Sequence, residues 1–241
     1  MADPLLTLSG VHTHIGPYHI LQGVDLVVPR GGVSVLLGRN GAGKSTTLRT
    51  IMGLLKPSRG EIRFDGRLIG GTPTPAISRA GIAYVPENMG VFSDLTVGEN
   101  MQLAATQGAF DATRLSWIKA LFPPIATFWE KPAGTLSGGQ KQMLAVARAI
   151  IEPRRLILID EPSKGLAPAI VTAMTRALGE LKETDTTILL VEQNFAMASA
   201  LGDTVSVMDD GRVVHAGDMA ELSGDAGMQE RLMGLSLEVH Q

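Results

Sequence analysis

The chain has 241 residues, of which 44% are hydrophobic and 19% are charged, so it can bury a sizeable core in one large domain, or in one domain with a lobe. Its formal net charge of −3 argues against a broad basic surface for nucleic acid, and the absence of cysteine excludes disulfides and thiolate metal sites. We expect no signal peptide, because the start M-A-D-P-L-L-T-L-S-G has no basic segment and no long apolar run, and the other apolar runs are too short to span a bilayer.

The first thirty residues are typical of an antiparallel β patch, which ends at the turn residues 29–32. After this patch, short runs rich in leucine and β-branched residues alternate with stretches of helix length. The alternation predicts parallel strands joined by crossover helices. The predicted strands are residues 33–38, 81–86, 155–160, 186–191 and 204–208, and the predicted helices include residues 44–55, 166–183 and 195–201.

Two hairpins are predicted at the Asp-Gly pairs Asp65-Gly66 and Asp210-Gly211. The stretch from about residue 96 to residue 149 is mostly helical in pattern and is interrupted by prolines, which predicts a helical lobe inserted into the α/β body. We therefore expect a single domain over residues 1–241, with the α/β core and its β patch in residues 1–86 and 151–224, the lobe in residues 87–150, and an unplaced C-terminal tail in residues 225–241.

Residues 33–49 contain a pattern for binding phosphate: an apolar strand, a turn with the spacing G-x-x-x-x-G-K-S, and a helix. The glycines let successive backbone N–H groups face an anion, and the helix adds its positive N-terminal end. Lys44 is expected to reach the β- and γ-phosphates, and Ser45 to place its hydroxyl on Mg²⁺. The strand and helix on either side disfavour a chance glycine turn with a surface lysine. This phosphate cradle consists of Gly38, Arg39, Asn40, Gly41, Ala42, Gly43, Lys44, Ser45 and Thr46.

Two acids end the apolar strand R-L-I-L-I-D-E-P, where buried carboxylates need a metal or water as a partner. Asp160 suits a contact with Mg²⁺, direct or through water. Glu161 is then placed to take a proton from the attacking water as general base. The alternative is a helix N-terminus with solvated acids, and the phosphate cradle upstream favours the catalytic interpretation.

The segment L-S-G-G-Q opens another predicted helix, with Ser137 and two glycines at its start. A helix N-terminus of this kind is a second anion site, which a single nucleotide in one chain does not require. In a two-fold pair of subunits, the cradle of one would face this segment of the other. The alternative is an ordinary N-cap with a flexible glycine pair.

The segments G-R-N-G-A-G-K-S, L-S-G-G-Q and L-I-L-I-D-E, in this order, resemble the ATP-binding subunit of an ABC transporter over about residues 5–220. The resemblance implies a P-loop NTPase fold that binds ATP and Mg²⁺ and hydrolyses ATP. It also implies two transmembrane permease subunits, a second ATPase subunit, an indirect link to a substrate-binding protein, and a peripheral place on the cytoplasmic face of the inner membrane. It assigns Ser137, Gly138, Gly139 and Gln140 to the nucleotide of the opposing subunit.

Three residues depart from the common family pattern. Glu87 stands where a glutamine usually contacts Mg²⁺ and water, Gln193 where a histidine usually touches the γ-phosphate, and Ala167 where aspartate is more usual. Gln193 can form hydrogen bonds but cannot titrate, so we expect it to position the γ-phosphate and the water, with Glu161 as the base. The rival interpretation is a site that binds ATP and hardly hydrolyses it.

All three departures resemble one of the two dissimilar ATPases in importers of branched-chain and other hydrophobic amino acids, and in their urea and amide relatives. A dissimilar second ATPase is therefore favoured over a homodimer. A fourth departure is Ile15, which stands at the position of the aromatic residue that stacks on adenine. Ile15 offers apolar contact without a ring, which predicts weak selectivity for the base.

Three alternatives stay open on the sequence alone. A soluble ABC protein of DNA repair or ribosomes is disfavoured, since the chain has one cassette and no long heptad insert. The other two are a non-hydrolysing regulatory module and a subunit of a lipid or polysaccharide exporter. The cargo cannot be read from this chain, because cargo contacts lie on other chains.

Overall fold

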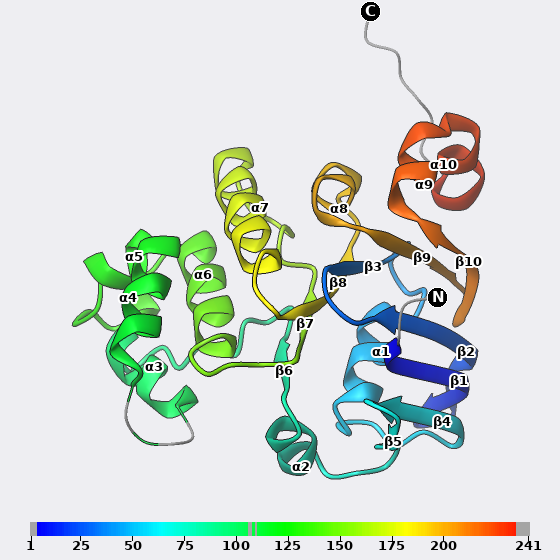
Figure 1. The fold of residues 1–241 in the computed structure, drawn as a ribbon, viewed down its shortest axis with the longest axis horizontal. Helices are drawn as coiled ribbons and strands as arrows, with labels where there is room; N and C mark the ends of the chain where they lie inside the picture. The colour runs from blue at the N-terminus through cyan, green and yellow to red at the C-terminus, as the bar shows by residue number, and fades with distance from the viewer. Residues whose placement is uncertain (1–3, 106–107, 109, 235–241) are drawn as a thin grey trace, which may run out of the picture.

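A computed structural model describes residues 4–105, 108 and 110–234, and two β-sheets organise this part of the chain (Figure 1). The smaller sheet is antiparallel and confirms the predicted β patch, to which the first predicted hairpin adds two strands. At the turn of this hairpin, Asp65 and Gly66 have positive φ angles of 52° and 73°, as a tight two-residue turn requires. The strand order is β2 (Tyr18–Pro29), β1 (Pro4–Ile15), β4 (Arg59–Phe64) and β5 (Arg67–Leu68).

The larger sheet has six strands and confirms the predicted α/β body, because all but one edge strand are parallel. That edge strand, β10 (Arg212–Asp218), pairs antiparallel with β9 (Thr204–Asp209) through the second predicted hairpin, where Asp210 and Gly211 have positive φ. The order continues with β3 (Val33–Gly38), β8 (Thr187–Glu192), β7 (Leu156–Asp160) and β6 (Ile82–Val85).

Two hydrophobic cores lie on opposite faces of the larger sheet, because successive residues of a strand point to opposite sides. In β3, Val35 and Leu37 join one core, whereas Leu36 joins the other, which lies under α1 (Lys44–Ile51) and the antiparallel sheet. With both faces covered, polar groups gather at the carboxyl edge of the parallel strands. The helices over the first core are α6 (Gly138–Ala149), α7 (Pro168–Lys182), α8 (Phe195–Leu201) and α9 (Met219–Gly224).

Near the first crossover, one predicted helix ends too late and one observed helix was not singled out. Helix α1 ends at Ile51 rather than at residue 55, because Met52 caps its C-terminus and Gly53 follows with a φ of +69°, the left-handed conformation in which helices commonly end. The short helix α2 (Thr74–Arg79) is missing from the sequence prediction, since six residues with a proline in the first turn are too few to show a helical period.

A run of helices lies between β6 and β7, as predicted, and Figure 1 shows it beside the body. Two prolines begin α5 (Pro123–Thr127), where a missing N–H removes no helical hydrogen bond. Helix α6 contacts α3 and α5 of this run as well as β6, so it connects the lobe to the sheet. The predicted boundaries of the lobe, residues 87–150, stay a prediction. The other elements of the lobe are α3 (Val97–Ala104), α4 (Ala112–Leu121) and the short 3₁₀ helix Ala133–Thr135.

The tail that the sequence left unplaced begins with a helix. In α10 (Ala226–Met233), the side chain of Asp225 caps the N-terminus by accepting a hydrogen bond from the backbone of Met228 at 2.9 Å. Residues 235–241 lie outside the described part of the chain. Within the described ranges, we find no helix that is both long and apolar enough to cross a bilayer.

Candidate active site

The glycine-rich turn between β3 and α1 forms the predicted phosphate cradle. Gly38 has no room for a side chain, because a Cβ there would lie 2.3 Å from the carbonyl oxygen of Met208. Gly43 precedes α1 with a φ of 104°, in a conformation that residues with a side chain rarely adopt. This turn places the positive N-terminal end of α1 at the carboxyl end of β3, where an anion is favoured.

Lys44 lies inside the cradle with its side chain 4% exposed. Its Nζ donates to the carbonyl oxygens of Gly38 at 2.9 Å and Arg39 at 3.1 Å, and lies 3.2 Å from Glu161 Oε1. The ammonium is therefore satisfied by oxygen atoms of the protein. Phosphate oxygens that enter the turn can take over these contacts, as the sequence predicts for Lys44.

Ser45 and Asp160, the predicted Mg²⁺ residues, lie together at the sheet edge. Ser45 Oγ donates to Asp160 Oδ1 at 3.0 Å, and the hydroxyl of Tyr84 donates to Asp160 Oδ2 at 3.3 Å. Burial raises the pKa of Asp160 above its ordinary value, although both hydrogen bonds oppose the rise. A buried carboxylate and a hydroxyl form an oxygen donor set that fits a hard divalent cation, and such a cation would favour the ionised carboxylate.

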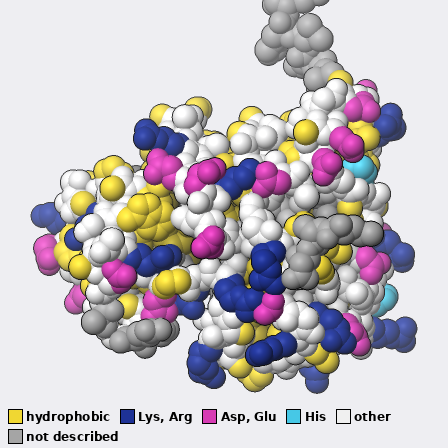
Figure 2. Space-filling model, in the orientation of Figure 1, with side chains coloured by type: hydrophobic (Ala, Val, Ile, Leu, Met, Phe, Trp, Pro, Cys, Tyr) yellow, Lys and Arg dark blue, Asp and Glu magenta, His cyan; other side chains and the backbone are white. Residues whose placement is uncertain are grey.

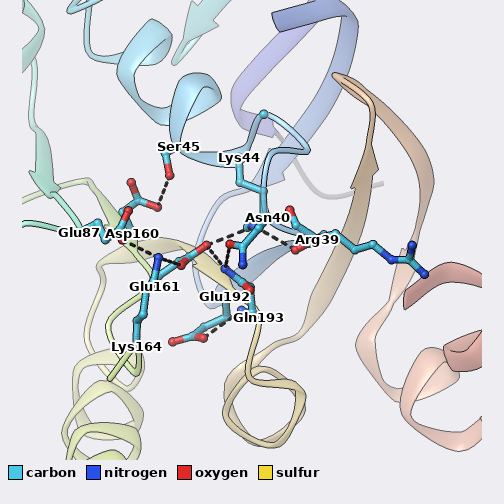
Figure 3. Close-up of polar contacts among 12 residues, drawn as sticks. Arg39, Asn40, Lys44, Ser45, Glu87, Asp160, Glu161, Lys164, Glu192 and Gln193 are labelled. Carbon is cyan, nitrogen blue, oxygen red and sulfur yellow. Dashed lines mark hydrogen bonds and ion pairs between the residues drawn. The ribbon is translucent and has the colours of Figure 1, made fainter. Parts of the chain in front are cut away.

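Glu161 follows β7 with a positive φ of 47°, which is unusual for a residue with a side chain. Figure 3 shows its carboxylate between the cradle and the end of β8, where Oε1 accepts a hydrogen bond from Gln193 Nε2 at 2.6 Å. Burial, the largest influence, acts to raise the pKa of Glu161, but hydrogen bonds from Gln193 and Lys44, together with nearby positive charge, hold that pKa below its ordinary value. The carboxylate is therefore ionised and oriented, as a general base requires.

Gln193 joins the end of β8 to the cradle. Its Nε2 donates to Asn40 Oδ1 at 2.7 Å as well as to Glu161 at 2.6 Å. Both N–H groups of the amide are therefore used, one on the glycine-rich turn and one on the candidate base. The structure brings Gln193 to the place that the sequence predicts, and its action on the γ-phosphate stays a prediction.

Glu192 organises the site, although the sequence analysis does not single it out. It is 1% exposed and accepts hydrogen bonds from Ser163 N and Oγ, and from the backbone N–H groups of Gln193 and Asn194, at 2.8 to 3.1 Å. These contacts tie the segment after β7 to the segment after β8. The signal that could have identified Glu192 is an acid at the end of a fully apolar strand, since a buried charge needs partners.

Glu87 lies after β6 and reaches the site through a lysine. Its Oε1 lies 2.6 Å from Lys164 Nζ, and the same ammonium lies 3.4 Å from Glu161 Oε2. The sequence analysis does not single out Lys164. The predicted contact of Glu87 with Mg²⁺ and water stays a prediction.

The L-S-G-G-Q segment opens α6 as predicted, with a reciprocal cap. Ser137 Oγ accepts from Gln140 N at 3.3 Å, and Ser137 N donates to Gln140 Oε1 at 2.9 Å. Gly138 is exposed, whereas a Cβ at Gly139 would lie 2.5 Å from the side chain of Ile170. In the part of the chain that the structure describes, no hydrogen bond joins this segment to the cradle.

Ile15, the predicted contact of adenine, ends β1 and pairs with Tyr18 at the start of β2. The two side chains are 39% and 70% exposed, so both have surface to offer a ligand. Which of them a base would touch is not decided by the chain alone, and the adenine role of Ile15 stays a prediction.

Comparisons with known proteins agree with this geometry. The ABC transporter family matches residues 21–164. The chain belongs to the ABC transporter family. BraG of Pseudomonas aeruginosa, a high-affinity branched-chain amino acid transport ATP-binding protein, is 37% identical over 232 residues, 95% of this chain and 100% of BraG.

Two further relatives place the match in sequence and in structure. LivF of Archaeoglobus fulgidus, a probable branched-chain amino acid transport ATP-binding protein, is 34% identical over 220 residues, 90% of this chain and 93% of LivF. A solved nucleotide-free ATP-binding cassette from an ABC transporter has a TM-score of 0.82 at 23% identity, over 97% of this chain and 100% of that chain. This last likeness shows the shared fold alone.

As an ABC ATPase, the chain binds and hydrolyses ATP. The cassette gathers its site residues from the carboxyl ends of four neighbouring parallel strands, β3, β8, β7 and β6. Because these ends meet at one edge of the sheet, residues up to about 150 positions apart in sequence, such as Asn40 and Gln193, contact one another.

Proposed function

We propose that this ABC ATPase energises an importer of branched-chain or other amino acids, or of urea or amides. The observation that carries the proposal is the similarity to BraG over nearly the full length of both chains. The similarity to LivF supports the same branch. The residues Glu87, Ala167 and Gln193 support it as well, since they depart from the common pattern in the manner of that branch.

The cradle holds the phosphates of ATP in this proposal, with Lys44 on the β- and γ-phosphates. Ser45 and Asp160 hold Mg²⁺, with Glu87 near the metal and the attacking water. When bound, Mg²⁺ neutralises charge on the transferred phosphoryl group. The donor set of Ser45 and Asp160 supports this assignment.

Glu161 takes the proton of the attacking water, and Gln193 orients that water and the γ-phosphate without titrating. Two contacts support this division. Glu161 is ionised and nearly buried, and the Gln193 amide touches both the base and the cradle residue Asn40. Without a nucleotide, the amide of Gln193 therefore links Glu161 to the glycine-rich turn.

The working unit pairs this chain with a second ATPase subunit, and a dissimilar partner is favoured over a second copy. The exposed start of α6, residues 137–140, supports a pair, because an anion-ready helix N-terminus lies open and away from the cradle of its own chain. These residues then contact the γ-phosphate of the ATP held by the partner. Closure on ATP and opening after hydrolysis drive the attached permease.

Two transmembrane permease subunits dock on the body and the lobe, which places this chain on the cytoplasmic face of the inner membrane, with a substrate-binding protein linked indirectly. A groove of about 950 Å³ supports the docking, lined among others by Met52, Glu87 and Arg148. Phe92 and Leu103, in the adjoining loop and lobe, are 50% and 60% exposed. Figure 2 shows apolar side chains gathered on the lobe, as at protein interfaces.

The test is affinity purification of the tagged chain from detergent-solubilised membranes, with the bound proteins identified by mass. Recovery of two multi-span permeases and a second ATPase supports the importer. Recovery of soluble partners alone, or of this chain alone, contradicts transport and leaves an ATPase whose task lies elsewhere.

A further inference from the structure

Lys164 connects two acids that follow two neighbouring strands, β6 and β7. Its Nζ lies 2.6 Å from Glu87 Oε1 and 3.4 Å from Glu161 Oε2. Figure 3 shows Lys164 extending from the segment after the base toward both carboxylates. Glu87 lies in the loop that lines the groove of about 950 Å³, whereas Glu161 ends β7. One ammonium therefore links the groove to the candidate base.

The backbone that carries Lys164 is held in place on both sides. Lys164 N donates to the carbonyl oxygen of Glu161 at 3.1 Å. The preceding residue, Ser163, gives its N–H and its hydroxyl to the buried Glu192 at 2.9 and 2.8 Å. A lysine on such an anchored turn holds its partners more firmly than one on a free loop, because less conformational entropy is lost in each contact.

The two lysines at Glu161 differ in what ATP does to them. Among the described residues, the ion pairs of Glu161 are with Lys44 and Lys164. Lys44 lies in the phosphate cradle, so bound phosphates draw its ammonium away from the carboxylate. Lys164 lies outside the cradle, so bound phosphates would not compete directly for its ammonium.

We propose that Lys164 is a positioning residue for Glu161: it keeps the carboxylate of the base in place while Lys44 binds phosphate, and it ties the base to Glu87 in the groove. The proposal rests on the proposed role of Glu161 as general base. It also accounts for an acid at position 87, since the charge of Glu87 completes the bridge. Lys164 follows Glu161 by three residues on one turn, so this turn brings the ammonium to a base that is 7% exposed.

The first test measures the link without catalysis. Thermal unfolding of the full nucleotide-free chain is compared for Lys164→Ala, Glu87→Gln and the double variant. We expect the double variant to lose less stability than the sum of the two single losses, because either change alone removes the same ion pair. Purely additive losses would overturn the link.

The second test measures steady-state hydrolysis of ATP by the full chain in its assembled complex. In Lys164→Ala, we expect kcat to fall about fivefold while KM for ATP changes less than about twofold, because an exposed ion pair is worth at most about a factor of five and acts here on the base rather than on nucleotide binding. Lys164→Arg should restore most of kcat, since it keeps the charge.

Lys182→Ala is the matched control, because Lys182, the last residue of α7, forms an ion pair of the same length, 2.6 Å, through its Nζ with Asp203 before β9. We expect it to lower stability and leave kcat unchanged. A kcat for Lys164→Ala equal to that of wild type, or no recovery in Lys164→Arg, would overturn the positioning role. Absence of hydrolysis by the wild type would instead contradict the proposed function, and the unfolding cycle would still decide the link.

Discussion

The two segments of this ABC cassette that are predicted to bind phosphate differ in where their polar groups find partners. In the cradle, Lys44 is nearly buried and is satisfied by carbonyl and carboxylate oxygens of the same chain. At the start of α6, Ser137 and Gly138 are exposed, and the hydrogen bonds of the cap close within the segment. The polar groups of the cradle find their partners within one chain, whereas the start of α6 is open to solvent. The proposed pairing with a second ATPase subunit would give this open segment a partner.

The largest effect is expected from a change at Glu161, the candidate base beside the phosphate cradle. Glu161→Gln keeps the size of the side chain but cannot take a proton, so kcat should fall about 10³-fold, within the range of general-base catalysis. Phosphate release by the assembled complex measures this. Glu180→Gln, on the exposed face of α7, is the control and should behave as wild type. Turnover of Glu161→Gln near the wild-type rate would place the base elsewhere.

Gly138→Asp tests the exposed start of α6. A Cβ at Gly138 meets nothing within 4 Å, so the isolated chain should unfold at the wild-type temperature. In the assembled complex, the added carboxylate would face the phosphates held by the partner, and hydrolysis should fall about a hundredfold. Gly224→Asp, at another glycine with open space, is the control. A marked loss of stability in the isolated chain would show that the start of α6 is closed by its own chain.

Gln193 lies between the phosphate cradle and the candidate base, where it contacts Asn40 and Glu161. In Gln193→Ala the hydrogen bond to the charged Glu161 is lost, so kcat should fall about tenfold. Gln193→His should keep most of the turnover, since a ring N–H can replace the amide donor. Parallel assays of phosphate release decide the matter, and an alanine variant that hydrolyses ATP as fast as wild type would remove the positioning role.

The smallest effect concerns the stability of the nucleotide-free chain. Folding lowers the pKa of Glu161 below its ordinary value of 4.5, so its ionised form stabilises the fold above that pH, and this stabilisation is lost as pH falls through the lower pKa of the folded state. Glu161→Gln should therefore be less stable than wild type at pH 7. Urea unfolding between pH 7 and pH 4 should show this difference shrinking, and a difference that grows on acidification would contradict the sign.

Most of the architecture could be predicted from local pattern. The strands of the parallel sheet differ from the observed ones by about a residue at each end, and both Asp-Gly hairpins form as predicted. The prediction failed at the C-terminus of helix α1, which stops at Ile51 because Gly53 adopts a left-handed conformation. A glycine just past a helix is a local stop signal that the prediction did not use. The Thr72 carbonyl can lie close to residue 53 because glycine has no side chain.

The residues of the candidate site fall into two groups: those that a motif identifies and those that only their contacts reveal. Ser45, Asp160 and Glu161 could be chosen because their motifs specify the chemistry, and the structure brings them together at the sheet edge. Lys164 and Glu192 could not be chosen from a motif in the same way, because their roles depend on partners that follow other strands. A charged residue in a sequence shows a need for a partner and leaves the partner unnamed.

By itself, the sequence determined the order of strands and helices, the phosphate cradle and the chemistry of the acids after β7, because hydrophobic period, glycine spacing and residue type act locally. Tertiary structure decided which of these groups meet. The parallel sheet brings the ends of β3, β7 and β8 to one edge, so that the amide of Gln193 bridges Asn40 and Glu161. It also brings Lys164 between Glu87 and the base. Contacts between separate strands depend on the packing of the whole sheet, and no local segment of sequence contains that information.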